Sequence, residues 1–301
     1  MFLTQIKQIK NHSNSVYSLL LLKDGRIASC SWDSTLKIYN PNNDYHCDIT
    51  LGSTFSKEYI ISICQLDNGN LVSGSSIKNE DWSYSSFIKI WSITTCKCVF
   101  TINYANRKVI VKVISIPNNR IVSCSLEKDI KVWNEYSDTP IKILKGHQCS
   151  LRSIIYINNR NLLISSSSDN TLRMWNMKTF QCINIINGIN GFSANSLYQI
   201  DNDRIIVGNV NYIFIVNINN CIIEKSIKDD KLGNIRAFEI INDEYILGGG
   251  PINFVLIKRD TFEHKFTKDV HKGTIDSILK IGNKTILTCS NLYSIISIWK
   301  F

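Results

Sequence analysis

One short motif recurs through the whole chain at a nearly constant spacing. Each copy ends in a five-residue apolar run, and the runs are LKIYN, IKIWS, IKVWN, LRMWN, IFIVN, FVLIK and ISIWK. The fourth residues of these runs lie 52, 42, 42, 41, 41 and 42 positions apart; they are Tyr39, Trp91, Trp133, Trp175, Val216, Ile257 and Trp299. A chain filled by seven copies of one unit must fold as a repeated supersecondary structure.

Each copy also contains two earlier runs that are rich in isoleucine, valine and aromatic residues. In the first copy these runs are SVYSLLLL and GRIASCS, separated by Lys23 and Asp24. Short β-branched runs bounded by turn-forming residues are strand signals, and no segment keeps a helical period. The unit is therefore predicted to be a four-stranded antiparallel meander, which makes the fold class all-β.

The fourth copy shows which family these repeats resemble. It reads GHQCSLRSIIYINNRNLLISSSSDNTLRMWN and places Gly146 and His147 ahead of a serine, an aspartate and a tryptophan. This pattern resembles the WD-repeat family, whose blades pack radially around a channel. The resemblance implies a seven-bladed β-propeller over residues 1–301, as a single domain.

The chain ends indicate how such a ring would close. Only Lys300 and Phe301 follow Trp299, so the seventh copy lacks its fourth strand, while QIKQIKNH near the start matches PIKILKGH of residues 140–147. We expect residues 1–10 to complete blade seven, because an unpaired sheet edge invites aggregation. The longer second copy predicts a loop insertion in blade two, at residues 76–87.

The His, Ser, Asp and Trp of the fourth copy permit two interpretations. Taken alone, His147, Ser165 and Asp169 look like a hydrolase triad. The family resemblance instead implies a buried hydrogen-bonded tetrad with Trp175, which satisfies four polar groups at once. We favour the structural tetrad.

The other copies depart from this pattern. The first keeps His12, Ser29 and Asp33 and offers the phenol of Tyr39 in place of the indole. Copies five and six are expected to lack the tetrad, with Gly208 and Gly248 at the serine position.

No enzymatic or cofactor motif accompanies the repeats. The chain lacks the GxxxxGK[ST], HExxH and GxSxG patterns, and the close pair Cys96 and Cys98 has no histidine nearby. We expect no catalytic residues, no metal site and no cofactor.

The resemblance also indicates which residues would meet a partner. The face that carries the tetrad histidines and aspartates is the usual binding face of the family. Aromatic and arginine side chains dominate binding hot spots, so the candidates are those expected on that face. They are Tyr17, Trp32, Tyr59, Trp82, Tyr84, Arg152 and Arg236. We expect the aromatic residues to cluster over blades one and two, with Arg152 across the channel.

The favoured function is a non-catalytic protein–protein interaction scaffold that binds a peptide or protein loop on this face. One alternative is a substrate receptor of a ubiquitin ligase that reads a phosphorylated motif through Arg152 and Arg236. Against it, the repeats leave no room for an F-box, and the WDxR motif is missing. The other alternative, an RNA- or ribosome-associated propeller, rests on the net charge of +9 alone. Nucleic-acid binding is not favoured because the lysines are scattered.

The chain start and the cysteines bear on the compartment. MFLTQIKQIKNH lacks the apolar core of a signal peptide, and no apolar run approaches the length of a membrane span. Most of the ten cysteines fall in strand-like runs, which favours reduced, buried thiols. We expect a cytoplasmic or nuclear protein that does not bind membranes and acts as a monomer within a larger complex.

Overall fold

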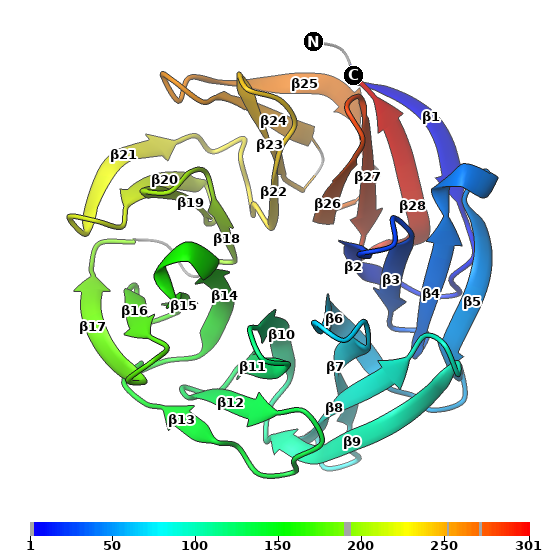
Figure 1. Ribbon diagram of the computed structural model, residues 1–301. Coiled ribbons are helices and arrows are strands. Elements are labelled where there is room, and N and C mark those ends of the chain that lie inside the picture. Colours follow the sequence, from blue (N-terminus) through cyan, green and yellow to red (C-terminus); the bar gives the residue numbers. More distant parts are fainter. Residues whose placement is uncertain (1–2, 190–193, 252, 271–272) are drawn as a thin grey trace.

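The computed structural model describes residues 3–189, 194–251, 253–270 and 273–301. Its strands form seven four-stranded sheets, arranged as blades around a central channel (Figure 1). Within each blade neighbouring strands pair antiparallel, as a repeated meander requires. The predicted all-β class and the seven-bladed propeller are confirmed.

The first four blades are each a continuous stretch of chain. Blade one consists of β2 (Val16–Leu21), β3 (Ile27–Ser31), β4 (Thr35–Asn40) and β5 (His46–Gly52). Blade two consists of β6 (Tyr59–Gln65), β7 (Leu71–Lys78), β8 (Tyr84–Ser92) and β9 (Lys97–Asn106). Blade three consists of β10 (Ile110–Ile116), β11 (Arg120–Ser125), β12 (Ile130–Asn134) and β13 (Lys142–Leu144). Blade four consists of β14 (Leu151–Ile157), β15 (Leu162–Ser167), β16 (Leu172–Asn176) and β17 (Gln181–Ile186).

The last blade combines both ends of the chain. Blade five consists of β18 (Ser196–Gln199), β19 (Arg204–Gly208), β20 (Tyr212–Asn217) and β21 (Ile222–Lys228). Blade six consists of β22 (Ala237–Ile240), β23 (Tyr245–Gly249), β24 (Asn253–Lys258) and β25 (His264–Val270). Blade seven consists of β26 (Ile275–Ile281), β27 (Thr285–Ser290), β28 (Tyr293–Lys300) and β1 (Thr4–Ile9). The helices of the described residues are the short turns η1 (Pro41–Asn43) and η2 (Asn158–Arg160), and none of them could cross a lipid bilayer.

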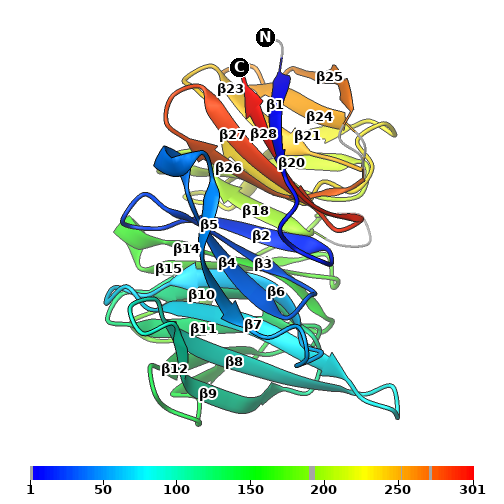
Figure 2. The ribbon, with the colours of Figure 1, turned by 90° about the vertical axis from the view of Figure 1, so that its right-hand side faces the viewer.

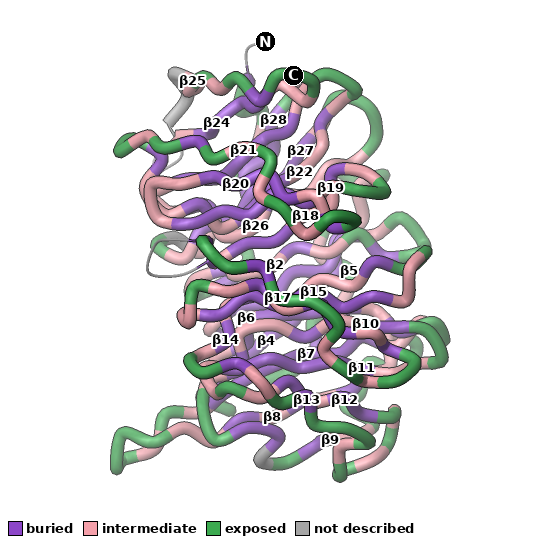
Figure 3. The backbone as a smooth tube through the Cα atoms, turned by 90° about the vertical axis from the view of Figure 1, so that its left-hand side faces the viewer, coloured by how far each residue is buried: buried purple, intermediate pink, exposed green. Residues whose placement is uncertain are grey.

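The core lies between the blades. Strands β3 and β15 are buried at every position because neighbouring blades cover both of their faces. The outer strand β5 instead alternates between exposed residues and residues that are partly or fully buried, and Figure 3 shows exposed segments along the outside of the ring. A cluster of buried apolar side chains lies between each pair of neighbouring blades. The apolar residues of the strand-like runs thus form the contacts between neighbouring blades.

Closure follows the predicted route. β1 pairs antiparallel with β28, with Thr4 opposite Lys300 and Ile9 opposite Ile296, and the two strands run side by side in Figure 2. Leu3 and Ile9 are buried in the clusters on either side of blade seven. The N-terminal strand therefore covers the edge that β28 would otherwise expose; residues 1 and 2 of the predicted segment 1–10 lie outside the described residues.

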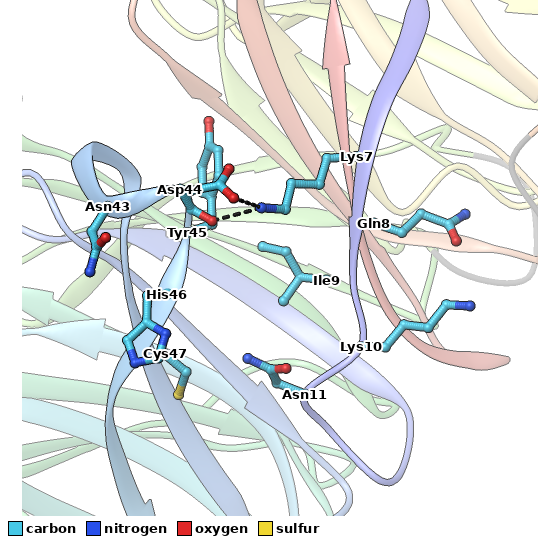
Figure 4. Close-up of a pocket in the computed structure, with 10 residues that line it drawn as sticks. All are labelled: Lys7, Gln8, Ile9, Lys10, Asn11, Asn43, Asp44, Tyr45, His46 and Cys47. Carbon is cyan, nitrogen blue, oxygen red and sulfur yellow. Dashed lines mark hydrogen bonds and ion pairs between the residues drawn. The ribbon is translucent and has the colours of Figure 1, made fainter.

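A second contact ties this strand to blade one. Lys7 Nζ lies 2.6 Å from Asp44 Oδ2 and donates a 2.8 Å hydrogen bond to the Asp44 carbonyl oxygen (Figure 4). The two segments border a shallow groove of about 420 Å³. This exposed ion pair adds little to stability by itself, so strand pairing and burial provide most of the closure.

The blade-two insertion takes a different form from a simple loop. Residues 76–78 extend β7 and residues 84–87 lie in β8, so that only residues 79–83 form the turn. Ser76 Oγ and Ser86 Oγ lie 2.8 Å apart across the extended pair. The extra residues therefore lengthen a hairpin, whose tip carries Trp82.

Candidate functional site

The blade-four tetrad is a continuous chain of hydrogen bonds. Trp175 Nε1 donates to Ser165 Oγ at 2.9 Å, and Ser165 Oγ lies 2.8 Å from His147 Nε2. His147 Nδ1 lies 2.8 Å from Asp169 Oδ2. Because the indole N–H only donates, the Ser165 hydroxyl donates onward to Nε2, and the imidazole proton sits on Nδ1.

This network is fixed electrostatically as well as geometrically. Burial lowers the pKa of His147, against the opposing effect of Asp169, so the imidazole stays neutral near pH 7. Burial works against ionisation of Asp169, but hydrogen bonds from Thr171, the Gln148 amide and His147 lower the pKa of its carboxyl to about 2. Ser165 is fully buried and His147 is 3% exposed, so this triad is closed to any substrate. The arrangement supports the structural interpretation of the tetrad.

Blade one contains the same network without its last link. Ser29 Oγ lies 2.7 Å from His12 Nε2, and His12 Nδ1 lies 2.8 Å from Asp33 Oδ2. The Tyr39 ring is buried near Ser29, yet its hydroxyl has no hydrogen-bond partner of good geometry among the described residues. The phenol of Tyr39 thus lies beside Ser29, as predicted, but it lacks the well-aligned bond that the Trp175 indole donates to Ser165 in blade four.

The remaining blades keep a shorter form of the network or none. Among the described residues, blades two, three and seven retain the bond from a tryptophan Nε1 to a hydroxyl: Trp91 to Ser73 at 2.9 Å, Trp133 to Ser123 at 3.0 Å and Trp299 to Thr288 at 2.8 Å. In blade six Gly248 occupies the serine position, where a Cβ atom would lie 2.6 Å from Val255 Cγ1. The prediction that Gly208 occupies the serine position of blade five is wrong by one residue, because the strand register places Val207 at that position.

Three of the predicted partner-binding aromatics meet on one surface. The rings of Tyr17 and Trp32 stack with centroids 4.9 Å apart and an interplanar angle of 20°, and Trp32 also contacts Tyr59 at 4.9 Å and 47°. All three side chains are partly buried. We call Tyr17, Trp32 and Tyr59 the aromatic platform; it spans blades one and two.

The centre of the platform is not required by the fold. Trp32 N donates to the Ser15 carbonyl at 3.0 Å, and in blade four Ser168 N donates to the Ser150 carbonyl at 2.9 Å, so the two turns are equivalent. A serine therefore suffices at the position of Trp32. Moreover, the Trp32 indole N–H is buried without a partner in the described part of the chain, which is a cost to stability.

Trp82 and Tyr84 lie apart from the aromatic platform. Trp82 is 77% exposed in the turn of the β7–β8 hairpin, and Lys78 Nζ lies 3.5 Å from the centroid of its ring. Among the described residues neither ring contacts a platform ring. The structure thus does not form the predicted five-residue cluster, because the insertion lengthens both strands and places Trp82 at the hairpin tip.

The two predicted arginines differ in their partners. Both line the central channel, whose volume is about 770 Å³. Arg236 Nη1 lies 2.7 Å from Asp276 Oδ1, whereas Arg152 Nε donates to Ser168 Oγ at 2.8 Å and pairs with no described carboxylate. Of these two arginines, Arg236 is neutralised by Asp276, whereas Arg152 has no matching carboxylate among the described residues.

Lys112 also lines the channel, although no sequence motif singled it out. Each of the other six blades has a residue equivalent to Lys112 on its innermost strand. In every blade this residue pairs with the position on the second strand that directly follows the tetrad serine or the residue in its place. Five of these residues are serines and one is alanine; they are Ser18, Ser62, Ser153, Ser196, Ser277 and Ala237. Aligning the repeats at this position would have identified Lys112 as the exception.

Comparisons with known proteins agree with this architecture. A family model described as WD domain, G-beta repeat matches residues 3–40 and 138–176. Nuclear distribution protein nudF 1 of Talaromyces marneffei is 40% identical over 73 residues, which are 24% of this chain and 16% of that protein. Cell division control protein 4 of Saccharomyces cerevisiae is 21% identical over 230 residues, which cover 68% of this chain and 28% of that protein. The chain thus spans less than a third of each of these relatives.

A solved structure extends the similarity over the whole ring. The crystal structure of the WD40 beta propeller domain of Doa1 superposes with a TM-score of 0.77 at 16% identity, over 99% of this chain and 97% of that one. At 16% identity this match supports the fold and nothing beyond it. The fold is thus a seven-bladed β-propeller, in which residues 3–40 and 138–176 match the model of the WD domain, G-beta repeat.

Proposed function

We propose that this propeller is a non-catalytic interaction scaffold that holds a peptide or protein loop of a partner on the aromatic platform. WD-repeat propellers are typical protein-interaction scaffolds. The observation that carries the proposal is the contact of Trp32 with Tyr17 and Tyr59, because the equivalent turn of blade four has the small residue Ser168 in place of Trp32. An aromatic group that the fold does not need, with an unsatisfied indole N–H, is better explained by binding than by stability.

The platform is suited to this role because its rings support one another. Trp32 lies between two tyrosines, so the outer ring surfaces are held in place before a partner arrives. Preorganised aromatic surfaces lose little side-chain entropy on binding. We propose that the partner covers Tyr17 and Tyr59 directly and that Trp32 acts mainly by positioning them.

Capture from a cell lysate tests the proposal. The wild-type protein, a Tyr17→Ala/Tyr59→Ala variant and a Tyr136→Ala control are immobilised, and retained proteins are quantified by mass spectrometry. Tyr136 is 51% exposed and packs edge-on against Phe100, away from the platform, so the control also removes an exposed tyrosine ring. We expect at least one partner that the platform variant loses and the control retains; a partner set unaffected by the platform variant would refute the proposal.

Neither alternative function gains a specific observation. A phosphate reader built on Arg152 and Arg236 is disfavoured because Asp276 already occupies Arg236. The RNA-associated alternative still rests on net charge alone. We also propose a cytoplasmic or nuclear location, which suits the free cysteines, and a monomeric scaffold within a larger complex.

A further inference from the structure

The central channel contains positive charge that the fold leaves unmatched. Lys112 projects from β10 into a ring of positions otherwise held by serine or alanine. Its ammonium has no hydrogen bond or ion pair within the described residues, and the residue opposite on β11 is the buried thiol Cys124. A partly buried ammonium without a counter-charge is costly.

A second unmatched cation lies on the neighbouring strand. Arg152 lies on β14 and lines the same channel. β14 is the innermost strand of the blade next to that of β10 (Figure 1). Its Nε is used by Ser168, which leaves the terminal nitrogens of the guanidinium free of any described carboxylate. Blades three and four therefore present two uncompensated cations from adjacent innermost strands.

The acidic groups of the channel are already engaged on the opposite side. Asp276 of blade seven pairs with Arg236 and accepts from the Asn291 amide at 2.8 Å. Glu239 of blade six accepts a 3.2 Å hydrogen bond from the Tyr198 hydroxyl, and Lys280 lies near its carboxylate. The channel is therefore polarised, with matched charge over blades six and seven and unmatched positive charge over blades three and four.

We propose that Lys112 and Arg152 form an anion-binding site in the channel, which takes a phosphate or carboxylate group of the peptide held on the aromatic platform. This rests on the proposed function. Tyr17 belongs to both the platform and the channel lining, so one peptide can contact both. A guanidinium fork and an ammonium together suit an anionic group with several oxygen atoms.

Methyl NMR with small probes tests the site without knowledge of the partner. The isoleucine methyl groups of Ile114 and Ile155 line the channel on β10 and β14 and report binding there. The probes are N-acetyl-phosphoserine amide and N-acetyl-glutamate amide. Tighter binding of the first indicates a phosphorylated ligand, and tighter binding of the second indicates an acidic side chain.

Variants decide whether the two cations carry the binding. We expect Lys112→Met and Arg152→Gln each to weaken the tighter probe at least about tenfold, since each removes a charge-assisted contact. The control Arg236→Gln/Asp276→Asn removes a matched ion pair from the same channel and should bind like the wild type. Thermal melts verify that each variant is folded.

The proposal fails if neither probe shifts the channel methyls of the wild type, or if both single variants bind as tightly as the wild type. This failure is distinct from that of the proposed function. If the Tyr17→Ala/Tyr59→Ala variant still loses its partner while the probes do not bind, only the anion site is refuted.

Discussion

Replacing Ser165 with alanine removes the central member of the blade-four tetrad. The Ser165 hydroxyl accepts from Trp175 Nε1 at 2.9 Å and lies 2.8 Å from His147 Nε2, and it is fully buried. The change leaves two buried polar atoms without partners, each at a cost of about 1–3 kcal/mol. We expect the free energy of unfolding to fall by about 2–6 kcal/mol.

Blade three supplies a matched control for this prediction. Ser123 is equally buried, but its only hydrogen bond within the described chain comes from Trp133 Nε1 at 3.0 Å. Ser123→Ala orphans one polar atom instead of two, so its cost should be about half that of Ser165→Ala. Urea denaturation followed by tryptophan fluorescence measures both. A loss for Ser165→Ala no larger than that for Ser123→Ala would refute the additive role of the histidine link.

Three further changes test other parts of the structure. Tyr39→Phe removes a buried hydroxyl that has no well-aligned partner among the described residues, so urea denaturation should show equal or higher stability; a loss above about 1 kcal/mol would mean that the hydroxyl is bonded to Ser29. Burial raises the pKa of Glu239 to about 7, so between pH 4.5 and 7 the folded state holds a proton that the unfolded state releases. As the pH rises from 4.5 to 7, the free energy of unfolding of the wild type should therefore fall by up to about 3 kcal/mol relative to that of Glu239→Gln. Parallel pH profiles of the two proteins would contradict this. Removing residues 1–10 exposes the edge of β28 and loses the burial of Leu3 and Ile9, which stabilises the fold by about 3–6 kcal/mol. We expect a lower melting temperature, and aggregation that light scattering detects. An unchanged melting temperature would contradict closure by β1.

The repeat predicted most of the fold because its period is fixed by the blade itself. The spacing of Tyr39, Trp91 and their equivalents in the other copies located every blade. The match between residues 5–12 and 140–147 predicted that the first strand pairs with the last, as β1 does with β28. These features depend on local pattern and on edge pairing, which a sequence displays directly. The register error at Gly208 arose where the tetrad residues that anchor the alignment are missing.

Features that depend on contacts between blades were harder to predict. The sequence placed Trp32 on the binding face but did not show that Tyr17 and Tyr59 would cover it, because stacking depends on side-chain conformations in neighbouring blades. Trp82 was predicted to join the cluster from a long loop, whereas most of the insertion pairs as strands. Arg236 looked free until the fold brought Asp276 to it from the next blade.

The most direct measurement is a titration of the captured partner against the wild type, the Tyr17→Ala/Tyr59→Ala variant and the Tyr136→Ala control by isothermal calorimetry. One hot-spot aromatic contributes about 2 kcal/mol or more, so even if only one of the two tyrosines is a hot spot, the platform variant should lose at least about 30-fold in affinity while the control binds normally. Equal affinities for all three proteins, with intact melting curves, would contradict binding on the aromatic platform.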